Sequence, residues 1–78
     1  MSTSEVIKNS GITRQQLYYL EQKGYVVPKR ISFGDIDSRE FSSDDLDKIR
    51  FIWKYLQEGF KHKVAYQKAL HDLTTLKG

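Results

Sequence analysis

The stretch GITRQQLYYLEQKG, residues 11–24, decides the fold. Thr13 and Gln16 have the spacing of a capping box, in which a threonine hydroxyl accepts from the backbone N–H three residues on and that residue's side chain reaches back. Gly24 supplies the left-handed residue with which helices commonly end. The sequence therefore predicts a helix that begins at Thr13 and runs to about Lys23.

A shorter helix is predicted just before this stretch. Ser2 and Glu5 repeat the capping spacing, and Gly11 is a helix breaker. Two helices joined by a turn of about three residues form a helix-turn-helix, here over residues 2–24. A helical hairpin that binds no nucleic acid shows the same pattern, so the surface residues must decide between these two interpretations.

The next segment indicates a β-hairpin. Residues 25–27, Tyr-Val-Val, form a β-prone run that Pro28 should stop, and residues 29–40 mix Gly34, Asp35, Asp37 and Ser38 with isolated apolar residues. We expect a two-stranded antiparallel hairpin, or wing, over residues 25–41. The sequence leaves its register open.

Two more helices are predicted after the wing. Ser42 and Asp45 mark the start of a helix over residues 43–58, and a last helix covers residues 62–76. Along the first, Leu46, Ile49, Trp53 and Leu56 fall at helical spacing with Ile52 alongside, and Phe60 continues this spacing past the end of the helix. Along the last, the apolar residues at helical spacing are Val64, Leu70, Leu73 and Leu76, with Tyr66 and Ala69 beside them. The prediction is one mainly α domain over residues 1–78, a winged helix-turn-helix of about four helices and a small hairpin.

Composition restricts the function classes. The chain of 78 residues allows one core, and its lack of cysteine excludes disulfides, thiol nucleophiles and cysteine-ligated zinc. No apolar run reaches about 18 residues and no signal peptide is visible, so we expect a cytoplasmic protein without membrane association. A formal charge of +3 and a pI near 9.2 favour polyanionic partners.

The sequence shows no catalytic or metal-binding pattern. His62 and His71 are separated by nine residues without acidic or cysteine partners at ligand spacing, and we expect them to be surface residues. Asp44 and Asp45 are better explained as helix-capping residues than as catalytic carboxylates. The expectation is a protein that is not an enzyme and that binds no metal or cofactor.

Polar and aromatic residues cover one side of the second helix. If Leu17 and Leu20 face the core, the opposite face presents glutamines, which can pair with adenine, and tyrosines, which can contact phosphate or a thymine methyl. The candidate DNA-binding residues are Thr13, Arg14, Gln15, Tyr18, Tyr19 and Gln22 on this helix and Lys29, Arg30 and Arg39 on the wing. The alternatives are a solvated face with half-buried tyrosines and a hairpin whose charges provide solubility.

These residues resemble the DNA-binding domain of MerR-type transcription regulators. The matching positions are Glu5-Val6, Gly11-Ile12-Thr13, Leu17, Tyr19, Glu21, Gly24, Pro28, residues 39–46 and Glu58-Gly59-Phe60. The resemblance implies four helices with a hairpin wing, the second helix in the major groove, and wing residues on the adjacent backbone. By position, Tyr19 matches a DNA-contacting tyrosine and Arg39 a wing arginine.

Several positions depart from the family pattern. The family's Arg-Tyr-Tyr triplet is replaced by Tyr18-Tyr19-Leu20, so its arginine contact is missing, and Arg14 is the nearest residue that could substitute. Ile7 replaces a small alanine, and Ser38 replaces an aromatic residue of the wing. These differences affect the expected sequence preference and wing geometry.

The leading hypothesis is sequence-specific binding of double-stranded DNA for transcriptional regulation. One alternative is a protein-interaction module that docks an acidic or DNA-mimicking partner, and another is an excisionase-like architectural factor for recombination. RNA polymerase and a protein antagonist are the candidate protein partners. We expect the isolated chain to be monomeric, and the family resemblance implies an intact protein that dimerises through a further C-terminal region. The sequence indicates neither the operator nor an effector.

Overall fold

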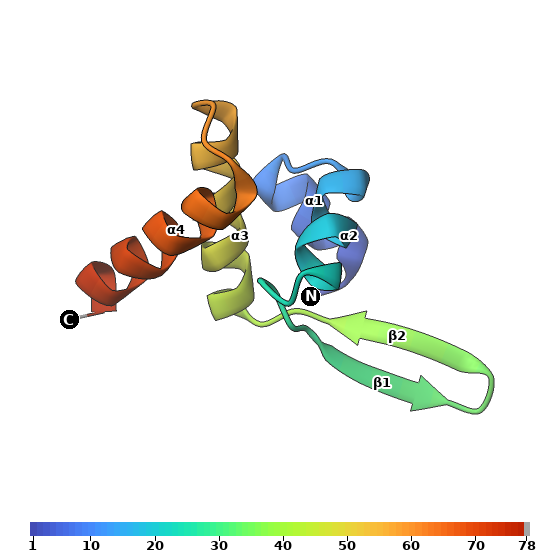
Figure 1. Ribbon diagram of the computed structural model, residues 1–78. Coiled ribbons are helices and arrows are strands. Elements are labelled where there is room, and N and C mark those ends of the chain that lie inside the picture. Colours follow the sequence, from blue (N-terminus) through green and yellow to red (C-terminus); the bar gives the residue numbers. More distant parts are fainter. Residues whose placement is uncertain (78) are drawn as a thin grey trace.

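A computed structural model describes residues 1–77 and shows a helical body from which a two-stranded hairpin projects (Figure 1). The elements are α1 (Thr3–Ser10), α2 (Arg14–Gln22), β1 (Lys29–Phe33), β2 (Ile36–Glu40), α3 (Ser43–Gln57) and α4 (His62–Lys77). Helices α3 and α4 pack against each other, and α1 packs against α3. The prediction of a mainly α winged helix-turn-helix is confirmed.

Local capping groups set the starts of α1 and α3. The Ser2 hydroxyl accepts from the Glu5 backbone N–H at 3.2 Å, and the Glu5 carboxylate accepts from the Ser2 N–H at 3.2 Å. Ser42 and Asp45 make the same reciprocal pair at 3.0 and 2.9 Å. Gly11 ends α1 with φ of 80°, a left-handed conformation that a side chain would strain. Both helix starts were therefore predicted correctly from residues close in sequence.

The predicted capping box of α2 is only half formed. The Thr13 hydroxyl accepts from the Gln16 N–H at 3.2 Å, as expected. The Gln16 side chain does not return to Thr13 but lies against His62 on α4. A tertiary contact has thus replaced the second local hydrogen bond.

The end of α2 turns the chain back toward the body. Lys23 is the C-cap, and Gly24 follows with φ of 76°. The backbone N–H groups of Tyr25 and Val26 then donate to the Leu20 carbonyl at 3.0 and 3.3 Å. This closure places Val26 in the core.

The hairpin begins later than predicted. The run at residues 25–27 is not a strand, and β1 starts at Lys29, after Pro28. Pro28 therefore precedes the strand rather than ending one, consistent with its missing N–H. The structure fixes the register with the pairs Lys29–Glu40, Arg30–Arg39, Ile31–Ser38, Ser32–Asp37 and Phe33–Ile36 around a turn at Gly34.

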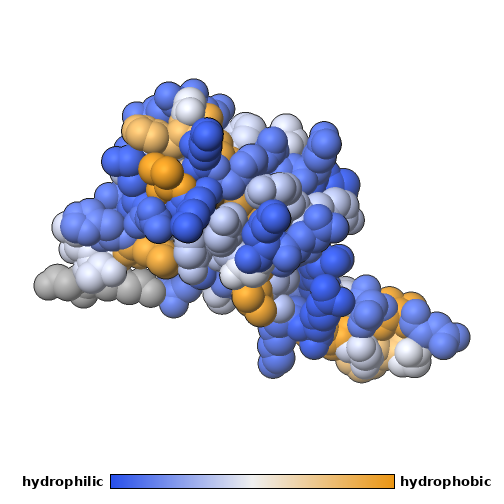
Figure 2. Space-filling view, in the orientation of Figure 1, coloured by the Kyte–Doolittle hydropathy of each residue, from blue (hydrophilic) through white to orange (hydrophobic). Residues whose placement is uncertain are grey.

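The tip of the wing is apolar and exposed. Phe33 and Ile36 face each other across the strands and are 74% and 69% exposed. Hydrophobic colour is visible on the projecting hairpin and also in patches on the body (Figure 2). Close to the body, the Phe41 N–H donates to the Met1 carbonyl at 2.7 Å. The described contacts therefore attach the wing to the body at its base.

Helices and the segments between them share one core. Its fully buried apolar residues are Val6, Ile12, Leu17, Leu20, Val26, Phe41, Ile49, Ile52, Ala65 and Ala69. Along α3, Ile49 and Ile52 are central, whereas Phe60 is exposed because it lies past the end of the helix and after Gly59. The expectation that Phe60 continues the apolar stripe of α3 was wrong.

The apolar stripe predicted for α4 was only partly right, because Ala69 and Tyr66, placed beside the stripe, pack in the core but most of its larger residues do not. Ala65 and Ala69 are fully buried, whereas Val64, Leu70 and Leu76 are exposed. Small residues at the contact let two helices approach closely, so side-chain size is a poor guide to the buried face of α4. None of the helices in residues 1–77 is both long enough and apolar enough to span a membrane.

Candidate nucleic-acid interface

The exposed face of α2 carries the polar and aromatic residues identified from the sequence. Leu17 and Leu20 are buried, so α2 is oriented with its other side outward. On that side Tyr18 is 41% exposed and Tyr19 is 36% exposed. The remaining α2 candidates, Arg14, Gln15 and Gln22, are exposed, as is the N-cap Thr13. One side of the helix thus presents both hydrogen-bonding groups and aromatic rings to solvent.

Arg39 connects the wing to this face of α2. Its Nε lies 3.0 Å from Oε2 of Glu21, and its guanidinium carbon lies 5.5 Å from the centroid of the Tyr18 ring. The Glu21 side chain is only 9% exposed, whereas that of Arg39 is 31% exposed. The pair therefore fixes β2 beside α2 and leaves part of the arginine accessible. Glu21 was not among the predicted site residues, because nothing local in the sequence pairs it with Arg39.

The two faces of the wing differ in charge. Arg30 and Arg39 are directly opposite each other in the ladder, so both side chains lie on the same face. Lys29 is opposite Glu40 and belongs to the other face, because successive strand residues alternate. The structure thus groups Arg30 with Arg39 and separates Lys29 from them.

The arginine face of the wing is suited to an anion. Like charges directly opposite in a ladder repel each other, and Glu21 compensates only one of these two arginines. Farther out on this face, Asp37 accepts a hydrogen bond from Ser32 Oγ at 2.6 Å. A phosphate at the base of the wing would therefore meet arginines, whereas one farther out would meet a carboxylate.

His62 also belongs to this region, which was not foreseen. It is the first residue of α4, and its Nε2 lies 2.7 Å from Gln16 Oε1. Its ring centroid lies 4.1 Å from that of Tyr19. His62 is thus half-buried against α2 instead of being a simple surface residue. The contact joins residues 46 positions apart, a separation over which sequence patterns give no signal.

The comparison with protein families agrees with this geometry. Residues 1–70 match the MerR HTH family of regulatory proteins. The chain belongs to this family. No curated protein matches it individually. Members are DNA-binding regulators and not a family of enzymes, so double-stranded DNA binding for transcription regulation is the general activity of this MerR-family chain.

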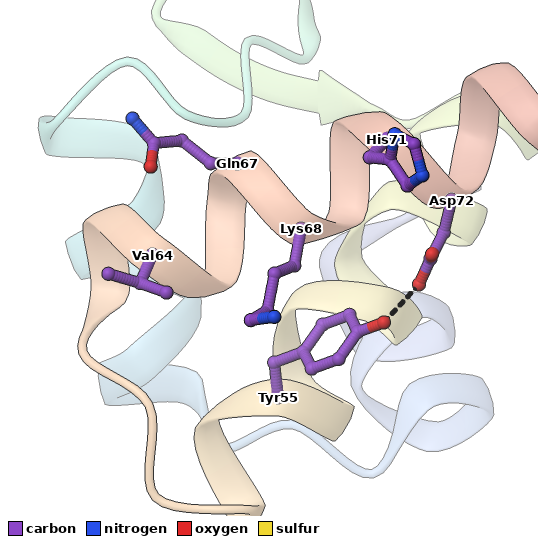
Figure 3. Close-up of a pocket in the computed structure, with 6 residues that line it drawn as sticks. All are labelled: Tyr55, Val64, Gln67, Lys68, His71 and Asp72. Atoms are coloured by element: carbon purple, nitrogen blue, oxygen red, sulfur yellow. Dashed lines mark hydrogen bonds between the residues drawn. The ribbon is translucent and has the colours of Figure 1, made fainter.

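A separate hollow of about 430 Å³ lies between α3 and α4 of the MerR-family chain (Figure 3). The Tyr55 hydroxyl donates to Asp72 across it, and this hydrogen bond raises the pKa of Tyr55 above its ordinary value. Lys68 Nζ lies 5.7 Å from the centroid of the Tyr55 ring. The hollow contains none of the candidate DNA-binding residues, and its main polar groups already bind each other.

The remaining titratable and ligand-forming groups add no second centre. The pKa of Glu5 is lowered, first by the hydrogen bond that its carboxylate accepts from the Ser2 backbone N–H and then by the contact of the carboxylate with the Ser2 hydroxyl. This shift is a consequence of helix capping. Within residues 1–77, no group of three or more histidines, aspartates or glutamates is arranged to hold a metal ion. The candidate site residues of the described chain lie on α2 and the wing, with His62 at the start of α4 beside them.

Proposed function

We propose that α2 enters the major groove of double-stranded DNA and that the wing contacts the adjacent backbone, giving sequence-specific transcriptional regulation. The observation that carries this proposal is the Arg39 contact with Glu21 and Tyr18. Because the contact holds the wing beside α2, both elements can meet one duplex without reordering. A surface fixed before binding loses less conformational entropy on association.

The residues divide into two roles in this proposal. Gln15, Tyr18 and Gln22 project from the exposed face of α2 and read base edges through hydrogen bonds and methyl contacts. Thr13 and Arg14 lie at the start of α2, where free backbone N–H groups and the helix dipole favour phosphate.

In this proposal the wing positions the protein on the DNA backbone and does not determine the sequence preference. Arg30 and the accessible part of Arg39 bind phosphates beside the groove, and Lys29 adds a cation on the other face of the hairpin. Tyr19, with its ring against His62, matches the family position of a DNA-contacting tyrosine. One module of this size makes few phosphate contacts, so we expect tight promoter binding to require a second copy.

A protein-interaction role is the second candidate. The paired arginines of the wing suit carboxylates as well as phosphates, so an acidic, DNA-mimicking protein could occupy the same surface. This alternative predicts the same footprint on α2 and the wing but no selection among duplex sequences.

An NMR titration of the ¹⁵N-labelled chain with duplex DNA tests the proposal. The duplex is obtained by selection from a random-sequence pool, and a scrambled duplex and a poly-glutamate peptide are the comparisons. We expect shifts at residues 13–22 and at Arg30 and Arg39, with tighter binding to the selected duplex. Shifts confined to α3 and α4, or equal affinity for the duplex and the peptide, would overturn it.

A further inference from the structure

His62 makes two contacts with one face of α2. Its Nε2 lies 2.7 Å from Oε1 of Gln16, and its ring lies 4.1 Å from that of Tyr19, measured between centroids at an interplanar angle of 42°. Gln16 and Tyr19 are three residues apart and therefore neighbours on the helix surface. A single imidazole thus touches successive turns of the predicted recognition helix.

The hydrogen bond restricts which nitrogen carries the proton. An amide oxygen only accepts hydrogen bonds, so Nε2 of His62 must donate to Gln16. This bond is compatible both with the neutral ring and with the imidazolium, which differ in the proton on Nδ1. Protonation can therefore add a positive charge beside α2 without breaking the contact with Gln16.

A lysine lies near the same tyrosine ring that His62 contacts. Lys23 Nζ lies 5.6 Å from the centroid of the Tyr19 ring that His62 contacts. Lys61 and Lys63 are the sequence neighbours of His62 at the start of α4. A polyanion on this surface would stabilise the imidazolium relative to the neutral ring. An imidazolium over the Tyr19 ring also gains a cation–π interaction.

We propose that His62 is a positioning residue of the DNA-binding surface, which holds Gln16 and Tyr19 in the orientation used for binding and takes up a proton when duplex DNA binds. This inference rests on the proposed function. Histidine is the side chain that ordinarily changes charge between pH 5 and 8. The affinity for DNA should therefore increase as pH falls through this range, by at most about tenfold per pH unit for one proton.

The contact can be tested without DNA. In ¹⁵N spectra of the wild-type chain, the side-chain amide of Gln16 should shift with pH between 5 and 8. The shift should persist in His71→Gln, a matched control because His71 is the other histidine and is exposed on α4. It should vanish in His62→Gln. A Gln16 amide that ignores pH in the wild type, or that responds equally in His62→Gln, would overturn the proposal.

The link to binding is tested by fluorescence anisotropy with the duplex selected by the wild-type chain. We expect wild type and His71→Gln to bind about three- to tenfold more tightly at pH 6 than at pH 8. His62→Gln should change less than twofold. His62→Leu, which fills similar volume without a donor, should keep the melting temperature but discriminate less between selected and scrambled duplexes.

The outcomes separate the two proposals. If wild type binds the selected duplex but His62→Gln keeps the same pH dependence, His62 has no such role and the proposed function stands. If wild type selects no duplex at any pH, the proposed function itself fails, and the proton-linked role of His62 fails with it.

Discussion

Arg39 on β2 and Glu21 on α2 form an ion pair at 3.0 Å that links the wing to the predicted recognition helix. Glu21 is almost fully buried, and Arg39 also lies 5.5 Å from the ring of Tyr18. The arginine that the family resemblance assigns to DNA therefore has a structural partner as well. Its contribution to folding and its contribution to binding must be measured separately.

Arg39→Ala should lower the free energy of unfolding by about 1–3 kcal/mol, because it leaves the Glu21 carboxylate buried without its partner. The measurement is urea denaturation followed by circular dichroism. Arg30→Ala is the matched control, because Arg30 is the arginine directly opposite Arg39 in the ladder and is exposed. This substitution should change the free energy of unfolding by less than about 0.5 kcal/mol. Equal stability of Arg39→Ala and wild type would show that the pair does not hold the wing.

Arg30→Ala should instead weaken binding to all duplexes about equally. A lost phosphate contact reduces the slope of log K against log salt concentration by about 1. Gln15→Ala, on the exposed face of α2, should leave that slope nearly unchanged and alter the preference among sequences. The measurement is anisotropy over a salt series with two duplexes. A change of preference in Arg30→Ala, or of slope in Gln15→Ala, would contradict this division of roles.

The sequence analysis succeeded where the interacting residues are close in sequence. Ser2 and Ser42 cap helices through partners three residues away, so their sequence patterns were sufficient. The failures involve partners from distant elements. The Gln16 side chain could bond Thr13 nearby or His62 far along the chain, and only the fold shows that it bonds His62.

Residue size also misled the analysis. On α4 the larger apolar residues at helical spacing suggested the buried face, but its fully buried apolar residues are alanines. Closely packed helices favour small side chains at their contact, and sequence periodicity does not report how closely two helices will approach. The outward face of α2 was easier to predict, because the burial of Leu17 and Leu20 alone determines which side of this helix faces solvent.

Tyr55 should titrate at a higher pH than an ordinary tyrosine. Its hydroxyl donates to Asp72, which raises the pKa of Tyr55 above its ordinary value of 10.0. Because the folded pKa is raised, the stabilisation is present below pH 10 and is lost as pH rises through the folded value. Absorbance of phenolate at 295 nm should therefore show a late component that Tyr55→Phe and Asp72→Ala both remove. Its survival in Asp72→Ala would rule out Asp72 as the cause.

The two buried alanines of α4 provide the sharpest test of the fold. Ala65 and Ala69 have no exposed surface, so Ala69→Leu must push α4 away from the core or force strained rotamers, at a cost of about 1–3 kcal/mol. In a domain of this size that corresponds to a fall in melting temperature of roughly 4–8 °C per kcal/mol. Leu70→Ala, at the adjacent and 37% exposed position, makes the opposite change in size and should shift stability by less than about 0.5 kcal/mol. The apolar stripe expected from periodicity predicts the reverse ranking, with Leu70→Ala the more damaging substitution. Thermal denaturation of the two variants therefore decides directly which face of α4 is buried.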